Sequence, residues 1–327
     1  MIRGKAYISA VAIAVMAMMM GLFVPRAGAD SGTTAGPATQ PDLGIGASLH
    51  GRRMFPADNW WNRDISNDPV DADSDAIVAG IGVGKSLHPD FGTGQNGAAN
   101  GIAYVVVSGD QPKVPVRFSA NDESDPGPYP IPPDAPVEGG ANSDSDRHVI
   151  VLDRDHWILY EIFAARKDPD GSGWSGYSGA IFDLNSNRLR PSGWTSADAA
   201  GLPILPGLVR YDEVVEQGHI DHALRFTCRR TRRAFIPPAT HFAGHSDSAD
   251  LPPMGMRVRL KASVDIGGFP PTAQVVLKAL KQYGMILADN GGSWFISGAP
   301  DPRWNDAEIE TLKRIHGGDF EVVQMGQ

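Results

Sequence analysis

Cysteine is almost absent from this chain of 327 residues, in which Cys228 is the single example. One thiol cannot form a disulfide within the chain, so a fold held together by disulfide bonds is excluded. Cys228 follows the apolar residues Leu224 and Phe226. We therefore predict that it is a buried, unreactive thiol, as most free cysteines are.

Long hydrophobic runs are confined to the N-terminus. Arg3 and Lys5 precede an uncharged apolar stretch over residues 6–24, and Ala27-Gly28-Ala29 supplies small residues before Asp30. This layout predicts a secretory signal peptide over residues 1–29, cleaved after Ala29. The alternative is a retained membrane anchor, since the stretch is nearly long enough to span a bilayer, but Pro25 and the small residues favour cleavage. We expect a secreted protein, extracellular or periplasmic.

Positive charge is also in short supply, with 29 Lys and Arg against 38 Asp and Glu. Loss of the predicted leader removes three basic residues and no acid, which takes the formal net charge from −9 to −12. Such a protein repels phosphate backbones and anionic lipids, so we expect no nucleic acid partner and no membrane partner after signal cleavage. Nothing in the sequence indicates self-association, and we expect a monomer.

Several catalytic motifs are missing. The chain has no His-Glu-x-x-His and no Gly-x-Ser-x-Gly, which argues against zinc peptidases of that type and ordinary α/β-hydrolases. Gly-x-Gly-x-x-Gly occurs at residues 92–97 and 171–176, but neither string follows a predicted strand and opens a helix. We expect no cofactor.

Residues 30–53 begin with a stretch rich in Ser, Thr, Gly, Ala and Pro, which predicts a disordered linker. From Met54 onward, short apolar runs alternate with Gly and Pro, the pattern of strands joined by turns. The sequence predicts strands over residues 103–107, 114–118, 148–153, 157–164, 180–184, 208–214, 223–227, 256–262, 285–288 and 294–297. Residues 54–327 should form a single mainly β domain, a β-sandwich or jelly roll with two or three short peripheral helices.

Local patterns add detail to this fold. Residues 256–262 alternate, which places Arg257, Arg259 and Lys261 on a solvent face. A polar turn at 154–156 predicts a hairpin between its two flanking strands, and the Asp289-Asn290-Gly291-Gly292 turn predicts another. Helices are expected over residues 271–283 and 74–81, and from Asn305 onward.

The segment over residues 194–213 is apolar, punctuated by Pro and Gly, and carries Asp198. A segment too apolar for a solvated loop often packs around a pocket, although it could also be a connection laid across a sheet. Glu161 lies within the apolar stretch 157–163, where burial would raise its pKa toward the range of a general acid. If that face of the strand is solvated instead, Glu161 has no such role.

Four histidines follow, at positions 219, 222, 241 and 245. Neutral imidazoles are preferred zinc ligands, so a zinc-dependent hydrolase using His222 and His241 is one alternative. Pro237, Pro238 and Gly244 disfavour a helix around His241, and we expect no metal. The interpretation we adopt is that His222 and His241 act as general acid and base with Glu161 or Asp198 as partner carboxylate. Histidines that only form hydrogen bonds at loop ends are the structural alternative.

Seven tryptophans complete the pattern, and most lie among Gly, Asn and Asp rather than in apolar runs. Exposed indole rings near amides and carboxylates suit stacking on sugars, although large rings more often seal loops. We expect Trp194 and Trp294 to be stacking platforms and Arg225, Asp289 and Asn290 to bind substrate.

Five stretches give the chain a wider resemblance: residues 146–155, 159–161, the segment that starts at Trp194, residues 222–226, and residues 288–295. Over most of residues 54–320 the chain resembles a family of secreted bacterial and fungal proteins that are known mainly as uncharacterised and are sometimes joined to carbohydrate-binding modules. The resemblance implies a secreted, glycan-directed role and assigns no catalytic residue. His222 and His241 match positions of the family pattern, whereas His219 and His245 do not.

Together these features predict a secreted carbohydrate-active enzyme that cleaves a polysaccharide, by hydrolysis or by elimination. Its catalytic residues would be His222, His241, Glu161 and Asp198. A glycan-binding or cell-envelope protein without catalysis is the main alternative, since the same tryptophans would serve it equally well. The proposal requires these distant side chains to meet in one groove.

Overall fold

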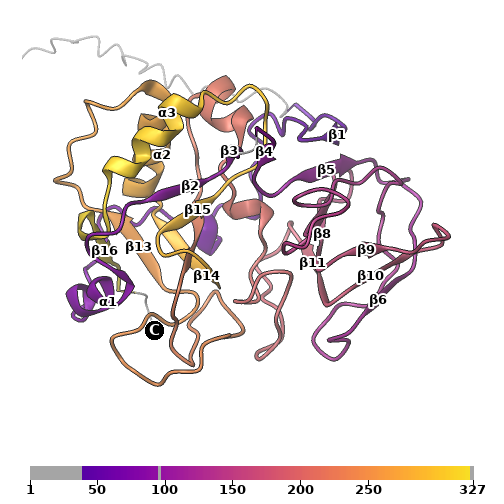
Figure 1. The fold of residues 1–327 in the computed structure, drawn as a ribbon, viewed down its shortest axis with the longest axis horizontal. Helices are drawn as coiled ribbons and strands as arrows, with labels where there is room; N and C mark the ends of the chain where they lie inside the picture. Colours follow the sequence, from indigo (N-terminus) through magenta and orange to yellow (C-terminus); the bar gives the residue numbers. More distant parts are fainter. Residues whose placement is uncertain (1–38, 95–96, 325–327) are drawn as a thin grey trace, which may run out of the picture. The chain divides into compact units, whose positions relative to one another are not determined.

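The computed structural model describes residues 39–94 and 97–324 (Figure 1). The chain divides into two units, Met1–Pro37 and Ala38–Gln327, and the described residues all belong to the second. The predicted signal peptide lies outside the described residues, as does the first part of the predicted linker. Among the described residues, no helix combines the length and apolar character needed to cross a bilayer.

The first main sheet has five strands in the order β1-β5-β7-β8-β11. They are β1 (Gly44–Ile45), β5 (Tyr104–Val107), β7 (Val149–Asp153), β8 (Ile158–Phe163) and β11 (Ser178–Asp183). β7 and β8 form the antiparallel hairpin expected from the turn at 154–156. Every residue of β7 is buried, because both faces of this sheet are covered.

The second main sheet has six strands in the order β16-β13-β14-β12-β15-β2. They are β2 (His88–Asp90), β12 (Leu224–Cys228), β13 (Arg257–Leu260), β14 (Met285–Asn290), β15 (Phe295–Ser297) and β16 (Phe320–Val322). β12 is parallel to β14, and β15 is parallel to β2. This mixed sheet thus brings together strands that are far apart in the sequence.

Smaller elements surround these sheets. The remaining strands are β3 (Gly92–Thr93), β4 (Ala99–Asn100), β6 (Val116–Phe118), β9 (Arg166–Lys167) and β10 (Trp174–Gly176). The α-helices of the described residues are α1 (Ser74–Ile81), α2 (Pro271–Gln282) and α3 (Asp306–Glu310). The 3₁₀ helices are η1 (Trp60–Asn62), η2 (Leu205–Gly207), η4 (Thr311–Arg314) and η5 (Gly317–Asp319), and η3 (Asp212–Gln217) is a π-helix.

The predicted helices are found where the sequence patterns place them. α2 begins at Pro271 and buries Ala273, Val276 and Leu280 along one stripe. Gly284 follows it with φ of +65°, a conformation that favours glycine after a helix. The predicted mainly β class with two or three short helices is confirmed.

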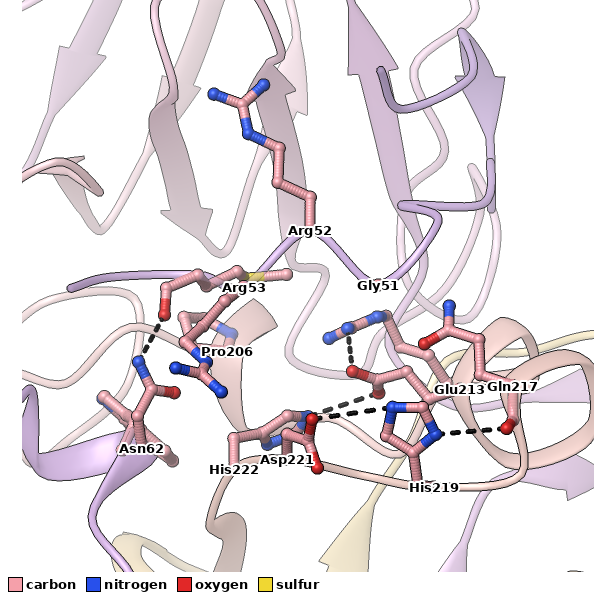
Figure 2. Close-up of a pocket in the computed structure, with 13 residues that line it drawn as sticks. Gly51, Arg52, Arg53, Asn62, Pro206, Glu213, Gln217, His219, Asp221 and His222 are labelled. Carbon is pink, nitrogen blue, oxygen red and sulfur yellow. Dashed lines mark hydrogen bonds and ion pairs between the residues drawn. The ribbon is translucent and has the colours of Figure 1, made fainter. Parts of the chain in front are cut away.

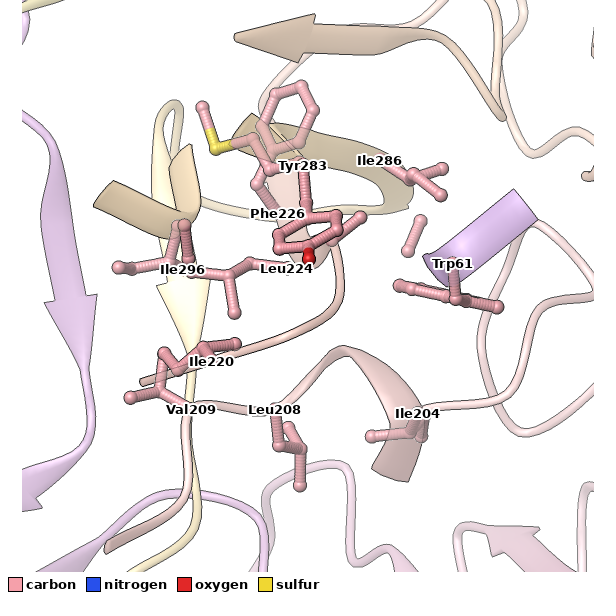
Figure 3. Close-up of a cluster of buried hydrophobic side chains, with 14 of the residues drawn as sticks. Trp61, Ile204, Leu208, Val209, Ile220, Leu224, Phe226, Tyr283, Ile286 and Ile296 are labelled. Atoms are coloured by element: carbon pink, nitrogen blue, oxygen red, sulfur yellow. The ribbon is translucent and has the colours of Figure 1, made fainter. Parts of the chain in front are cut away.

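A large core joins apolar side chains of the two main sheets. Figure 3 shows part of it, where Leu224 and Phe226 of β12 and Ile286 of β14 lie among Ile204 and Leu208 of the segment 195–210. A second core covers the other face of the first sheet, and its members include Val151, Tyr160 and Trp174. The segment 195–210 is therefore part of the interior, as its apolar composition indicates.

Two predictions about chain order are corrected by the structure. Residues 39–53 are folded rather than a linker, since β1 pairs with β5 and the side chain of Leu49 is fully buried. The strand predicted over residues 208–214 is wrong, because the chain there leaves η2 and enters η3. A short apolar run does not by itself distinguish a strand from a buried helical segment.

Two predictions about the second sheet are also wrong. Asp289-Asn290-Gly291-Gly292 does not close a hairpin, because β12 lies between β14 and β15. The expected solvent face of β13 is buried instead, with Arg257 0% exposed and Arg259 9% exposed. The Arg257 guanidinium donates to the carbonyl oxygens of Trp60, Arg63 and Tyr283, so backbone acceptors take the place of water.

Candidate functional site

A cleft of about 390 Å³, here the polar cleft, receives side chains from the second main sheet and from the segment that leads into β7. Asp289 and Asn290 reach it from the end of β14, and His148 reaches it from the residue before β7. Its polar side chains are those of Asp90, Asn100, Glu138, Ser143, Ser145, Asp146, His148, Arg225, Thr227, Asp289, Asn290 and Ser297. Hydroxyl, amide and carboxylate groups thus dominate its wall.

A buried ion pair stands behind the cleft. The Arg225 guanidinium donates to both carboxylate oxygens of Asp198, through Nε at 2.9 Å and Nη2 at 2.7 Å. Its Nη1 donates to the hydroxyl oxygen of Ser297. Arg225 is 3% exposed and Asp198 is fully buried, so each charge depends on the other for compensation. Asp198, expected to be a partner carboxylate, and Arg225, expected to bind substrate, are therefore joined in one ion pair.

A second ion pair is formed by His148 and Glu138. The His148 Nδ1 lies 2.6 Å from Glu138 Oε2, and its Nε2 lies 3.0 Å from the Ala197 carbonyl oxygen. Burial opposes protonation of His148, but the hydrogen bond and charge of Glu138 outweigh it and raise the pKa of His148 to about 9. The same contact outweighs burial at Glu138 and lowers the pKa of that carboxyl. This pair is therefore ionised at neutral pH.

Asp289 differs from both pairs because no arginine or histidine forms an ion pair with it among the described residues. Its Oδ1 accepts the Asn290 backbone N–H at 2.6 Å, and its side chain is half-buried at the wall of the cleft. Burial and the negative charge of Asp198 raise the pKa of Asp289 to about 7. A carboxyl that reaches solvent and holds its proton near neutral pH is suited to general acid catalysis.

Asp289 also lines a neighbouring cavity of about 300 Å³, here the Tyr177 cavity. His241 contributes an imidazole whose Nδ1 lies 2.7 Å from the Ala199 carbonyl oxygen and whose Nε2 lies 4.0 Å from Glu123 Oε2. The Tyr177 ring is 53% exposed and contacts Phe163 edge to face. Asp198 also lines this cavity, so the predicted residues Asp198, His241 and Asp289 are brought together.

Glu161 is not part of either wall. It is fully buried, and its carboxylate accepts the backbone N–H groups of Ile204 at 2.9 Å and Leu205 at 3.0 Å. Burial raises the pKa of Glu161 to about 7, as the sequence interpretation expects. Its contacts, however, anchor the segment 195–210, and it lines neither the polar cleft nor the Tyr177 cavity.

His222 is separated from His241. It lines a third cavity of about 140 Å³, here the Arg210 cavity, together with Glu213 (Figure 2). The His222 Nε2 lies 3.2 Å from Glu213 Oε2 and its Nδ1 lies 2.8 Å from the Ala223 carbonyl oxygen. The two histidines therefore share neither a cavity nor a partner, and the acid–base pair predicted from the sequence is not assembled.

The two predicted stacking platforms also lie elsewhere. The Trp294 ring is fully buried between Phe226 and Phe320, and its indole Nε1 donates to the Gly82 carbonyl oxygen at 2.9 Å. Trp194 is half-buried under the Arg190 guanidinium and lines none of the described cavities. Large rings with a satisfied N–H have more to gain from burial than from exposure.

The sequence interpretation misses Glu138, His148 and Asp90 as wall residues. His148 directly follows Asp146 and Arg147 and precedes a buried strand, and such a charged group at a strand end is a signal for a site. Glu138 and Asp90 lie among turn residues without such a signal. Asp289 and Asn290, expected to bind substrate, line the cleft, and they lie at a strand end rather than in the expected hairpin.

No group of three or more His, Cys, Asp and Glu side chains in residues 39–94 and 97–324 is arranged to hold a metal ion. Comparisons with models of protein families, with curated proteins and with solved structures find no match to this chain.

Proposed function

We propose that this chain is a secreted carbohydrate-active enzyme that hydrolyses a polysaccharide, with Asp289 as its general acid. The observation that carries the proposal is the state of Asp289, a half-buried carboxyl whose pKa is raised to about 7 at the wall of a polar cleft. Glycoside hydrolysis uses two carboxyl groups that flank the scissile bond, one protonated and the other ionised. Burial and the nearby Asp198 supply the first of these states.

The second carboxylate is provided by the cleft itself. Asp90 and Asp146 both line it, and the Asn100 amide donates to Asp90 Oδ1 at 3.1 Å. In the proposed reaction Asp289 donates its proton to the leaving glycosidic oxygen. The carboxylate of Asp90 or Asp146 either takes a proton from the water that attacks the anomeric carbon, or attacks that carbon itself to form a glycosyl-enzyme, which water then hydrolyses with Asp289 as base.

The geometry favours hydrolysis over elimination. Elimination acts on uronates, whose carboxylates need a cationic group to neutralise them, but Arg225 is already engaged by Asp198 and Ser297. Glu138 similarly engages His148. The two positive side chains of the cleft are therefore compensated, and the remaining carboxylates repel an anionic glycan. We accordingly propose a neutral or cationic glycan as substrate.

The Tyr177 cavity extends the proposed binding surface beyond the cleft. An exposed phenol ring supplies a flat apolar face of the kind that packs on the C–H groups of a sugar ring. Because Asp289 lines both cavities, a glycan chain bound across it would place sugar units in the polar cleft and in the Tyr177 cavity.

The test is incubation of the purified protein with a panel of neutral, amino and acidic glycans of plant, algal and bacterial origin. New reducing ends are expected on a neutral or amino glycan, and Asp289→Asn should abolish them. Asp247→Asn, which alters an exposed carboxyl outside the described cavities, should leave them unchanged.

The other outcomes separate the alternatives. Absorbance from unsaturated uronates would show elimination and contradict the proposal. Binding of a glycan by wild type and Asp289→Asn alike, with no product from either, would assign the chain to the non-catalytic glycan-binding class.

A further inference from the structure

The Arg210 cavity holds a buried cation with unused hydrogen-bonding capacity. Arg210 is 3% exposed and lines the cavity. Its Nη2 donates to Glu213 Oε1, and its Nε lies 3.6 Å from Asp212 Oδ1, which is beyond hydrogen-bond distance. Its Nη1 has no hydrogen-bond partner among the described residues, and neither does its Nε. A buried N–H without an acceptor is costly, so this guanidinium is set up to receive one.

The cavity around Arg210 is lined mainly by groups that donate hydrogen bonds. Arg53, His219 and His222 line it. Arg52 and Asn62 line it as well, but the Arg52 guanidinium is directed away from the other side chains (Figure 2), and the Asn62 amide already donates to the carbonyl oxygens of Met54 and Pro56. Figure 2 shows His222 beside Glu213 and His219 beside Asp221. The two ring nitrogens of His222 face the Ala223 carbonyl oxygen and Glu213 Oε2.

The negative groups of the cavity are largely engaged. Glu213 accepts from Arg210 and lies beside His222, and Asp221 lies 3.5 Å from His219. Arg52 packs over the Trp157 ring at 3.8 Å and donates to the Arg154 carbonyl oxygen. Arg53 is exposed at the cavity. Asp212 adds a third carboxylate beside Arg210, 3.6 Å from its Nε. Arg53 forms no ion pair among the described residues, so its positive charge at the cavity is uncompensated.

The size of the cavity restricts its occupant. Its volume of about 140 Å³ is less than half that of the polar cleft or of the Tyr177 cavity. A small ion with five heavy atoms, such as phosphate or sulfate, fits within it. Arginine is also the side chain best suited to bind such oxyanions, through several N–H groups in one plane.

We propose that the Arg210 cavity binds one small tetrahedral oxyanion of the phosphate or sulfate class. Arg210 Nη1 donates to it from the buried side, and Arg53 and His219 donate from the solvent side. This site is separate from the polar cleft, and it stands whether or not the chain hydrolyses a glycan.

The test is isothermal titration calorimetry of the full folded protein with sodium phosphate, sodium sulfate and sodium acetate, at constant ionic strength in a chloride buffer. Saturable binding of one phosphate or sulfate is expected. Loss of one charge-assisted hydrogen bond should weaken it about tenfold in Arg210→Lys and in Arg53→Gln. Asp221→Asn should tighten binding instead, because it removes a negative charge from the rim.

Arg230→Gln is the matched control, since Arg230 is exposed and lines none of the described cavities, and it should bind as wild type does. If Arg210→Lys fails to fold, the other two variants still test the proposal, because Arg53→Gln should weaken phosphate binding and Asp221→Asn should tighten it. Absence of saturable phosphate and sulfate binding, or equal weakening in Arg230→Gln, would overturn the proposal. Preference for acetate would show a carboxylate site and contradict the tetrahedral class.

Discussion

Glu161 and Asp289 are two carboxyls whose pKa burial raises to about 7, yet they stand in different surroundings. Glu161 is fully buried and accepts two backbone N–H groups of the segment 195–210. Asp289 is half-buried and lines two cavities. The same shift in pKa therefore marks a stabilising contact in one residue and an available proton donor in the other.

The raised pKa of Asp289 leads us to expect that activity depends on pH. If Asp289 is the general acid, hydrolysis requires its protonated form, and kcat should fall as the pH rises through about 7. A pH–rate profile on the best glycan of the panel measures this decline. Asp289→Glu, which keeps an acid but moves it, should lower kcat about 100-fold or more and retain a falling limb. An activity that rises steadily from pH 6 to pH 9 would remove Asp289 from this role.

The pKa of Glu161 makes a separate prediction about stability. In the unfolded chain a Glu titrates near about 4.3, so between that pH and about 7 the folded state binds the extra proton. The stability contributed by protonated Glu161 is thus fully present below about pH 4.3 and is lost as pH rises through about 7. Across this window the free energy of unfolding should fall by up to about 1.4 kcal/mol per pH unit.

Glu161→Gln should make this dependence shallower, because a Gln oxygen can still accept the N–H groups of Ile204 and Leu205 but does not titrate, while the slope that Asp289 contributes remains. Urea unfolding at pH 5, 6 and 7 compares the two proteins. Parallel curves for wild type and Glu161→Gln would mean that Glu161 has the same pKa in the folded and unfolded states.

At the scale of single elements, the strand β13 was predicted correctly from its alternating residues, but the face that carries its arginines is buried rather than exposed to solvent. Its alternation is real, but the face that carries Arg257 is covered by residues 60–65 and by the end of α2. Arg257→Met should destabilise the protein by about 3–5 kcal/mol, because buried carbonyl oxygens lose their donor. Lys261→Met, which removes a less buried cation just beyond β13, should cost about 1 kcal/mol or less. Chemical denaturation of both variants measures the difference, and equal losses would contradict this account.

Elements with strong local signals were predictable from sequence. The hairpin at 154–156 and helix α2 depend on turn residues, proline and apolar spacing that act over a few residues. The insertion of β12 between β14 and β15 was not predictable, because nothing local distinguishes a strand that pairs with its neighbour from one that pairs across it. Strand order depends on long-range packing, which short patterns do not encode.

At the scale of the whole molecule, the candidate site is assembled from segments around residues 90, 138, 148, 198, 225 and 289. Sequence reasoning identified Asp198, Arg225, Asp289 and Asn290, because charges in or beside apolar segments are conspicuous. It did not separate His222 from His241, since closeness in sequence says little about which cavity a loop residue faces. Trp294 was misplaced for the converse reason, as polar neighbours in the sequence do not prevent burial.

Residues 39–53 belong to the folded unit and should contribute to its stability. Residues 39–53 contribute the pairing of β1 with β5, the buried Leu49 side chain, and the Arg52 guanidinium over Trp157 at 3.8 Å. The Leu49 backbone N–H also donates to Asp212 Oδ2 at 2.8 Å. Burial of one leucine alone contributes about 1.5–3 kcal/mol, and the remaining contacts add to it.

A chain that begins at Thr39 keeps all of these contacts and is the reference. A chain that begins at Met54 should lose at least about 3 kcal/mol, which lowers Tm by about 5 °C, because a unit of about 290 residues has an entropy of unfolding of about 0.6 kcal/mol/K. Calorimetry of the two purified chains measures this difference, and Leu49→Ala in the Thr39 chain isolates the contribution of the leucine. If both chains unfold at the same temperature, residues 39–53 behave as the linker that their composition predicts, and the contacts of Leu49 and Arg52 contribute nothing to the folded unit.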